Sequence, residues 1–213
     1  MRVQQGDVSG TYDRLASRYD DWSAAVRPPL RELWAQKVDE WVAPGDPVVE
    51  LGCGTGEPVG RRLSERYEYE GVDASEQMLA KARTALPGVS FTHADMLSVE
   101  FPARSISAVV SFYAISHIPR GSHARLFDSI ASWLRSGGVF VGNLTSRDDP
   151  ESVEGHWLDA GPMRWSGFDE RANLDLLTQA GLSVVEHEVL HQIEPDGCEI
   201  DPMWFVAERI ATP

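Results

Sequence analysis

Three glycines fall within five residues directly after a short apolar stretch, at Gly52, Gly54 and Gly56. Glycine permits tight turns with positive φ and lets a ligand approach the backbone closely. A dinucleotide-binding loop needs glycine at its first, third and sixth positions. The sixth position here is Glu57, whose carboxylate stands where a pyrophosphate needs a free helix N-terminus. The Gly-Lys-Ser/Thr ending of a P-loop is also missing, so the spacing predicts a ligand without phosphate.

Two aspartates follow the next two predicted strands. Asp73 lies twenty-one residues after Gly52, where a carboxylate can accept hydrogen bonds from the two hydroxyls of a ribose. Asp95, in His93-Ala94-Asp95-Met96, can accept a hydrogen bond from an exocyclic amine such as that of adenine. The alternative for Asp73 is a solvated carboxylate at a strand end. Together with the glycine loop, the pair predicts a nucleoside site.

These residues need a scaffold of alternating strands and helices. The chain predicts two opening helices, near Ser9–Trp22 and from Pro28 to Trp41, before Ala43–Asp46 interrupts the helical pattern. Strands are expected at 47–51, 69–72, 89–92, 106–112 and 139–143, and helices at 57–66, 75–86 and 120–134. Such alternation is typical of an α/β fold with a mostly parallel sheet and helices on both faces.

The alternation is interrupted between residues 144 and 167. This stretch is rich in Asp, Pro, Gly and Ser, and we expect a long functional loop there. A helix over 168–180 follows, and then two extended runs, 182–193 and 203–208. The turn-rich joint Glu194-Pro195-Asp196-Gly197 predicts that these runs form an antiparallel hairpin.

Composition excludes several classes of function. The formal net charge of −14 disfavours a nucleic-acid partner, because binding phosphates depends on Lys and Arg. We find no run long enough to span a bilayer and no leader sequence at the N-terminus. Cys53 and Cys198 are far apart and lack metal-ligand spacing. We therefore expect a cytoplasmic protein with free thiols, no metal site and no membrane partner; the sequence indicates no oligomeric state.

Four segments resemble, in order, the motifs of class I S-adenosylmethionine-dependent methyltransferases. They are Glu50–Gly56, Gly71–Ser75 with Met78-Leu79, Ala94–Met96, and Gly137–Phe140. The likeness is strongest to small bacterial members that act on metabolites or natural products. It implies one Rossmann-like domain over 1–213, with a seven-stranded sheet whose last strand alone is antiparallel. Residues 1–44 would form a helical lid, and residues 144–168 a substrate-side insertion.

The resemblance also implies roles for individual residues. Gly52, Cys53, Gly54 and Gly56 would line the methionine and ribose part of S-adenosylmethionine, with Glu50 behind the loop. Asp73 would hold the ribose, Asp95 and Met96 the adenine edge, and Ala74 and Met78 the adenine face. Ser111 and Phe112 would approach the methionine portion. In the lid segment Tyr12–Asp20, Tyr19 would face the cofactor and is a candidate catalytic residue; Tyr12 would either line the site or pack the helix.

His117 is the candidate general base. It lies just beyond the fourth strand, where the resemblance places the transferred methyl group, and imidazole titrates near neutral pH. The alternative is a structural histidine that caps the next helix or bonds to the loop. Tyr113 would line the same pocket.

Aromatic side chains of the lid and insertion could form an acceptor site. Trp22, Trp157, Met163 and Trp165 would supply apolar walls, and aromatic faces attract an amine or a sulfonium through cation–π interaction. The alternative is a small satellite core that fixes the insertion to the sheet.

The sequence therefore predicts a methyltransferase that acts at O, N or C of a small molecule. One alternative is a lyase or cyclase that keeps the cofactor without transferring its methyl group. A second is a non-catalytic partner protein on the same scaffold, which the intact loop, Asp73 and Asp95 disfavour. A third, an NAD-dependent enzyme, is disfavoured by the missing sixth-position glycine.

Overall fold

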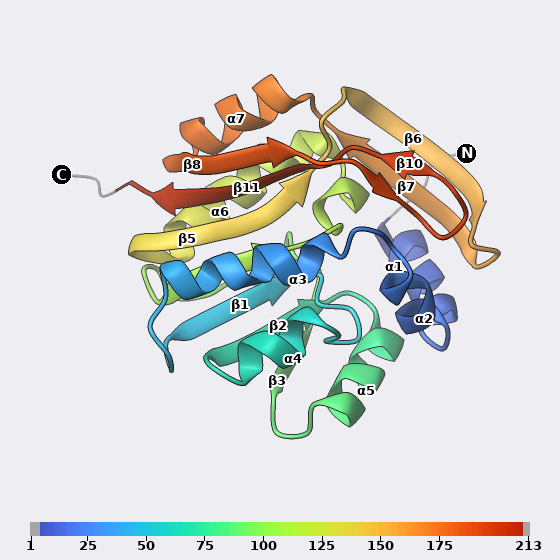
Figure 1. Cartoon of the computed structure of the whole chain (residues 1–213), viewed down its shortest axis with the longest axis horizontal. Helices are drawn as coiled ribbons and strands as arrows, with labels where there is room; N and C mark the ends of the chain where they lie inside the picture. Colours follow the sequence, from blue (N-terminus) through green and yellow to red (C-terminus); the bar gives the residue numbers. More distant parts are fainter. Residues whose placement is uncertain (1–4, 211–213) are drawn as a thin grey trace.

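The computed structural model describes residues 5–210 and contains one large sheet with helices on both faces (Figure 1). The start of the predicted lid, residues 1–4, lies outside the described residues. The order of the seven strands is β3-β2-β1-β4-β5-β11-β8. Their bounds are β1 Pro47–Leu51, β2 Glu68–Asp73, β3 Ser90–His93, β4 Ile106–Ser111, β5 Leu134–Leu144, β8 Leu182–Val189 and β11 Met203–Arg209.

Only β11 runs against its neighbours. It pairs antiparallel with β5 and with β8, whereas β1, β2, β3, β4 and β5 pair in parallel. The expected fold class and the expected antiparallel pairing of the final runs are therefore confirmed. Between β8 and β11 the chain adds a minor hairpin, β9 Gln192–Ile193 with β10 Glu199–Ile200.

Helices cover both faces of this sheet. Side chains of α6 (His123–Trp133) and α7 (Glu170–Gln179) belong to the core on one face, together with Phe140 and Phe205. On the other face α3 (Leu30–Ala35), the 3₁₀ turn Gln36–Glu40 and α4 (Val59–Ser64) pack over Val110 and Trp204. The inner strands are apolar because they are buried on both faces, as the run Ile106–Ser111 shows.

The predicted first helix is in fact two helices, α1 (Gln5–Leu15) and α2 (Tyr19–Ala24). The N–H of Arg18 bonds to the carbonyl of Leu15 at 2.9 Å, which closes a turn between them. The guanidinium groups of Arg14 and Arg18 bond to the carbonyls of Ala160 and Leu158. These contacts to a distant segment set the bend, which helical periodicity cannot reveal.

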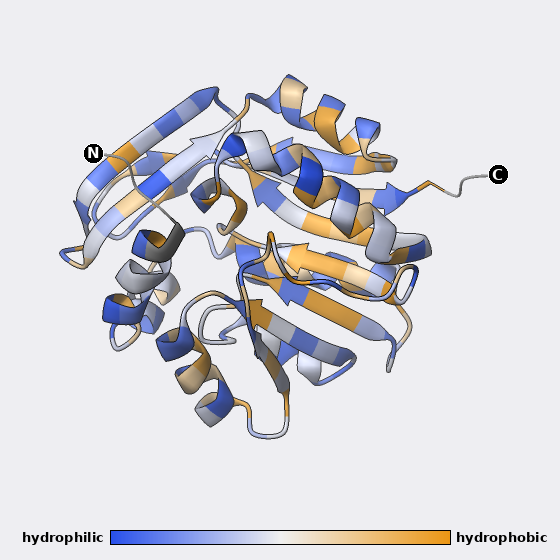
Figure 2. Cartoon of the chain, turned by 180° about the vertical axis from the view of Figure 1, so that it is seen from behind, coloured by the Kyte–Doolittle hydropathy of each residue, from blue (hydrophilic) through white to orange (hydrophobic). Residues whose placement is uncertain are grey.

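The expected long loop at 144–167 is wrong. The chain forms an antiparallel hairpin there, β6 (Asp149–Trp157) with β7 (Gly161–Gly167), which extends beyond the main sheet beside α1 and α2 (Figure 1). Seven successive residues of β6 are exposed, and Figure 2 shows this strand as largely hydrophilic while the central strands are apolar. A strand without a buried face has no alternating pattern, so the sequence carried no strand signal.

Several other element bounds differ from those predicted. Strand β5 begins at Leu134 rather than Val139, because Leu134 pairs with Ile106 before a register shift. The remaining predicted helix is α5, Glu76–Ala85, with Ser75 as its N-cap.

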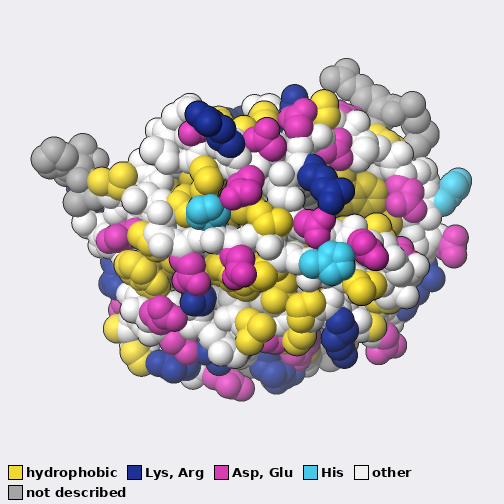
Figure 3. Space-filling model, turned by 45° about the horizontal axis from the view of Figure 1, so that its top comes forward, with side chains coloured by type: hydrophobic (Ala, Val, Ile, Leu, Met, Phe, Trp, Pro, Cys, Tyr) yellow, Lys and Arg dark blue, Asp and Glu magenta, His cyan; other side chains and the backbone are white. Residues whose placement is uncertain are grey.

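Within residues 5–210, no helix combines the length and apolar character needed to cross a membrane. On the face in Figure 3, Asp and Glu side chains are interspersed with apolar ones, and no continuous Lys and Arg patch is seen.

Candidate active site

The glycine loop turns back at the carboxyl end of β1, at the edge where parallel strands of an α/β sheet present ligand sites. Gly52 has φ of +75°, and a Cβ there would lie 2.3 Å from Cβ of Ala114. A side chain at this position is therefore excluded both by the backbone and by its neighbour. The N–H of Gly54 donates to Oδ2 of Asp73 at 2.8 Å, which ties the loop to the end of β2.

Asp73 is the central polar group of this edge. Its Oδ1 accepts the N–H of Ser75 at 2.8 Å, so each carboxylate oxygen holds one backbone donor. A carboxylate oxygen can accept a second hydrogen bond, and Asp73 faces a cavity. Burial raises the pKa of this carboxyl, which the backbone donors partly oppose.

This loop cavity has a volume of about 70 Å³. Asp95 lines it with Oδ1 bonded to the N–H of Leu97 at 2.9 Å, so that Oδ2 has no partner among the described residues. The structure thus gathers most of the predicted cofactor residues around one space: Tyr12, Tyr19, Gly52, Gly54, Asp73, Ala74, Met78, Asp95, Met96 and Phe112, with Tyr113 and His117.

Four predicted cofactor residues do not line this cavity. Glu50 lies behind the loop, where it accepts the hydroxyl of Tyr69 at 2.6 Å, and burial raises its pKa to about 8. Cys53 is buried against Gly71, and Gly56 against Leu86. Ser111 is fully buried, and its hydroxyl donates to the carbonyl of Leu51. In this structure these groups support the shape of the loop from behind.

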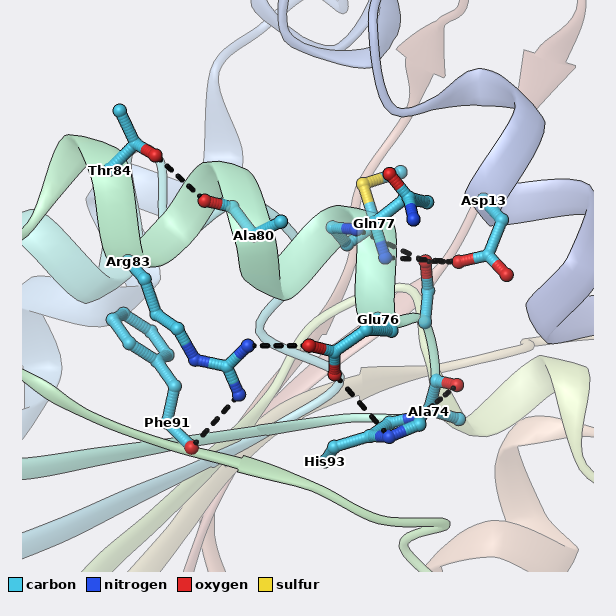
Figure 4. Close-up of polar contacts among 11 residues, drawn as sticks. Asp13, Ala74, Glu76, Gln77, Ala80, Arg83, Thr84, Phe91 and His93 are labelled. Carbon is cyan, nitrogen blue, oxygen red and sulfur yellow. Dashed lines mark hydrogen bonds and ion pairs between the residues drawn. The ribbon is translucent and has the colours of Figure 1, made fainter.

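The two lid helices are fastened over the loop cavity by carboxylates. Asp13 of α1 accepts the N–H of Gln77 at 3.1 Å and the hydroxyl of Ser75 at 2.6 Å at the start of α5 (Figure 4). Asp20 of α2 accepts the hydroxyl of Thr55 at 2.5 Å, within the glycine loop, and pairs with Lys81 at 2.6 Å. The lid is therefore joined directly to the elements that form the cavity.

His117 is buried between the lid and the hairpin. Its Nδ1 lies 2.9 Å from the carbonyl of Arg164, which can only accept, so Nδ1 carries the proton. Nε2 then accepts the hydroxyl of Tyr12 at 2.8 Å. Burial lowers the pKa of His117 to about 4. Both ring nitrogens are occupied and the ring is neutral, which favours the structural alternative over the general base.

A second, larger cavity of about 420 Å³ adjoins the first. The two share Tyr12, Tyr19, Tyr113 and His117. The indoles of Trp22, Trp157 and Trp165 line the larger one, and Trp157 lies 5.7 Å from each of the other two rings, centroid to centroid. Met163 is fully buried in a cluster with Val8 and Leu15 and does not line it. Met163 therefore belongs to a satellite core, and contact of the three indoles with an acceptor stays a prediction.

Three further polar residues of this larger cavity escaped the sequence analysis. The guanidinium of Arg31 lies 4.9 Å from the ring centroid of Tyr113 and has no carboxylate partner within residues 5–210. Asn143 ends the strand predicted at 139–143, so the rule that ligands meet the carboxyl ends of strands could have found it. Arg31 and Glu194 carried no local signal, because packing alone brings them here.

Comparison with known proteins gives the chain a family. The methyltransferase domain family matches residues 48–138. An uncharacterized methyltransferase of Bacillus cereus is 30% identical, over 81% of this chain and 82% of its own length. A trans-aconitate 2-methyltransferase of Acidovorax sp. (strain JS42) is 32% identical over 78% of this chain. The chain spans 62% of the length of that relative. It spans 58% of the length of a second similar protein, a trans-aconitate 2-methyltransferase of Rhizobium rhizogenes.

Solved structures share the fold. The CcbJ methyltransferase from Streptomyces caelestis superposes with a TM-score of 0.71 at 21% identity, over 95% of this chain and 99% of its own. The comparisons and the geometry indicate the same family, since the glycine loop and the two aspartates lie at the carboxyl edge of the sheet. The chain belongs to the class I S-adenosylmethionine-dependent methyltransferases.

Proposed function

We propose that this protein transfers the methyl group of S-adenosylmethionine to a small-molecule acceptor bound in the larger cavity. The observation that carries this is the meeting of two cavities at Tyr12, Tyr19, Tyr113 and His117. One cavity has the carboxylates for a nucleoside, and the other has aromatic walls and the size of a small-ligand pocket. When bound, the cofactor supplies an electrophilic methyl group on a sulfonium.

The residues of the loop cavity fit the cofactor by their donor and acceptor set. Asp73 would accept the ribose hydroxyls, and Oδ2 of Asp95 the adenine amine. Ala74, Met78 and Met96 would contact the adenine ring. Gly54 leaves room for a ligand, since a Cβ there would meet only the ring of Tyr19, at 3.9 Å.

The volume of the loop cavity adds a condition. About 70 Å³ holds only a few water-sized groups, and Tyr12 and Tyr19 of the lid occupy one wall. We expect α1 and α2 to adjust when a nucleoside binds. The bonds of Asp13 and Asp20 are the contacts that must adjust.

Arg31 would bind the carboxylate of the methionine moiety. Its guanidinium lies beside Tyr19 and Tyr113, at the junction of the two cavities. Arg31 is half-buried and forms no ion pair with a carboxylate within residues 5–210, so its guanidinium is available to an anionic ligand. Both ring nitrogens of His117 are already hydrogen-bonded, so the protein would act mainly by orienting the acceptor and excluding water. Tyr19 lines both cavities, and its catalytic role stays a prediction.

The test is an incubation with S-adenosylmethionine and a panel of small molecules that includes trans-aconitate. Mass spectrometry follows the cofactor and the acceptor. Methyl transfer forms S-adenosylhomocysteine together with an acceptor that is heavier by one CH₂. A modified acceptor with unchanged S-adenosylmethionine would instead establish the lyase or cyclase alternative.

A further inference from the structure

The charges of the larger cavity are strongly unbalanced. Two guanidinium groups, Arg31 and Arg147, face six carboxylates, which gives a formal balance of −4. Arg147 is already paired with Asp201 at 2.5 Å. The six carboxylates belong to Asp149, Glu154, Glu194, Asp196, Glu199 and Asp201.

Glu194 is the carboxylate best placed to meet a ligand. It begins the turn that closes the β9–β10 hairpin, where its N–H bonds to the carbonyl of Cys198 at 2.8 Å. The neighbouring Ile193 is fixed by two backbone hydrogen bonds with Arg27, of 3.2 and 2.9 Å. Among the described residues the Glu194 carboxylate has no hydrogen bond and no ion pair. It is thus rigidly mounted, half-buried and without a partner.

The electrostatic surroundings agree with this placement. Burial and, to a smaller extent, the charges of Asp196 and Glu154 together raise the pKa of Glu194 to about 7, against the opposing effect of Arg31. These carboxylates therefore act on one another across the cavity. A cation bound among them would relieve that repulsion.

Asn143 independently indicates a ligand in the same cavity. It is only 5% exposed, and its Oδ1 is occupied by the N–H of Tyr113 at 2.7 Å. Its amide nitrogen has no partner among residues 5–210, and the residue lines the larger cavity. Because the residue lines the cavity and this nitrogen forms no hydrogen bond there, the NH₂ group is available to donate to an oxygen of a bound molecule.

The aromatic lining of the cavity suits a cation as well. Trp22, Trp157 and Trp165 present aromatic rings to the cavity, and such rings attract ammonium groups. A polycarboxylate ligand would be repelled by the carboxylates of the cavity. The guanidinium of Arg31 could pair with it, but the carboxylate of the cofactor would compete for that guanidinium. Building on the proposed function, we propose that the methyl acceptor carries an amine that is protonated at neutral pH, with Glu194 as its counter-ion and Asn143 as donor to a neighbouring oxygen.

The test compares four probes of similar size by the quenching of tryptophan fluorescence, with and without S-adenosylhomocysteine. The probes are 2-phenylethylamine, 2-amino-1-phenylethanol, 2-phenylethanol and 3-phenylpropionate. We expect the amines to bind at least about tenfold more tightly than the carboxylate. Tighter or equal binding of 3-phenylpropionate, or binding of trans-aconitate, would overturn the inference.

Two variants locate the contacts. Glu194→Gln should weaken binding of both amines about five- to tenfold and leave 2-phenylethanol unchanged, whereas Glu68→Gln, at the exposed first residue of β2, should change nothing. Asn143→Ala should reduce the advantage of 2-amino-1-phenylethanol over 2-phenylethylamine, a ratio that a general loss of folding cannot alter. Unchanged amine affinity in Glu194→Gln contradicts the proposal. Failure of S-adenosylhomocysteine to bind would count against the proposed function, while the titrations without it still decide this inference.

Discussion

The hydroxyl of Tyr12 in the lid donates a hydrogen bond of 2.8 Å to Nε2 of His117, which follows β4. The carbonyl of Arg164, in β7, fixes the other ring nitrogen. One buried imidazole thus connects the lid, the sheet edge and the hairpin. Burial in this position lowers its pKa to about 4, and we therefore favour a structural role over that of a general base.

We expect His117→Gln to keep turnover within about threefold of the wild type, because a neutral imidazole with both nitrogens bonded is a poor base. The measurement is kcat and KM across pH 6–9, together with the free energy of unfolding. A loss above a hundredfold in kcat with an altered pH profile would restore the general base.

The same histidine should make stability depend on pH. The unfolded imidazole has a pKa near 6.5 and the folded one about 4, so the unfolded state binds more protons between these values. Stability therefore rises from pH 4 to pH 6.5 and is reduced on acidification, by roughly 1–3 kcal/mol for this group. Buried carboxyls such as Glu50, whose folded pKa is raised, act in the opposite direction. The measurement is the free energy of unfolding by urea at pH 7 and at pH 4.5, for the wild type and for His117→Gln. The wild type should lose more of this free energy on acidification than the variant does. Equal losses in the two proteins would contradict the burial argument.

Asp73→Ala should abolish measurable binding of S-adenosylmethionine. Two hydrogen bonds to a carboxylate, at about 1.5–3 kcal/mol each, correspond to at least a hundredfold loss of affinity. Calorimetry gives the affinity, and circular dichroism verifies that the variant is folded. Unchanged affinity in a folded variant would remove Asp73 from the site.

Arg31→Met should weaken S-adenosylhomocysteine about ten- to hundredfold without affecting 5′-methylthioadenosine, which lacks the amino-acid carboxylate. Comparing the two ligands in one variant separates loss of this contact from distortion of the cavity. If both ligands weaken equally, Arg31 shapes the site and binds no carboxylate.

Asp20→Ala should loosen the lid, because it removes the bonds to Thr55 and Lys81. We expect faster release of S-adenosylhomocysteine and faster proteolysis near α2. The free energy of unfolding should fall by about 1–2 kcal/mol. The matched control is Asp21→Ala, the exposed neighbour on the same helix. Equal release and proteolysis rates in the two variants would show that the Asp20 contacts do not hold the lid helices in place.

Gly52→Ala should destabilise the fold by roughly 3 kcal/mol or more, since its Cβ would lie 2.3 Å from Ala114 and φ is +75°. Gly45→Ala has a similar positive φ of +85° with open space around it, so its cost should be about 1 kcal/mol. Urea unfolding of both variants measures the difference, and equal values would mean that Ala114 moves aside freely.

Local sequence was sufficient for the cofactor side. Gly52 directly follows β1, Asp73 ends β2 and Asp95 lies two residues beyond β3, and parallel strands bring their carboxyl ends to one edge. Their meeting therefore depends on strand order rather than on fine packing. The predicted roles of Cys53 and Ser111 did not carry over to the cavity, because which side of a loop or strand faces a ligand depends on what packs behind it.

The acceptor side depended on contacts between distant parts of the chain. The strand β6 lacks alternation because almost all of its side chains face solvent, and the break between α1 and α2 is held by carbonyls near residue 160. Arg31, Asn143 and Glu194 come from three separate elements. The sequence by itself determined the fold class and the nucleoside-binding edge, since both follow from local periodicity and glycine spacing. Only the tertiary structure decided the charge, walls and lid of the acceptor cavity, because these arise from long-range packing that no local pattern encodes.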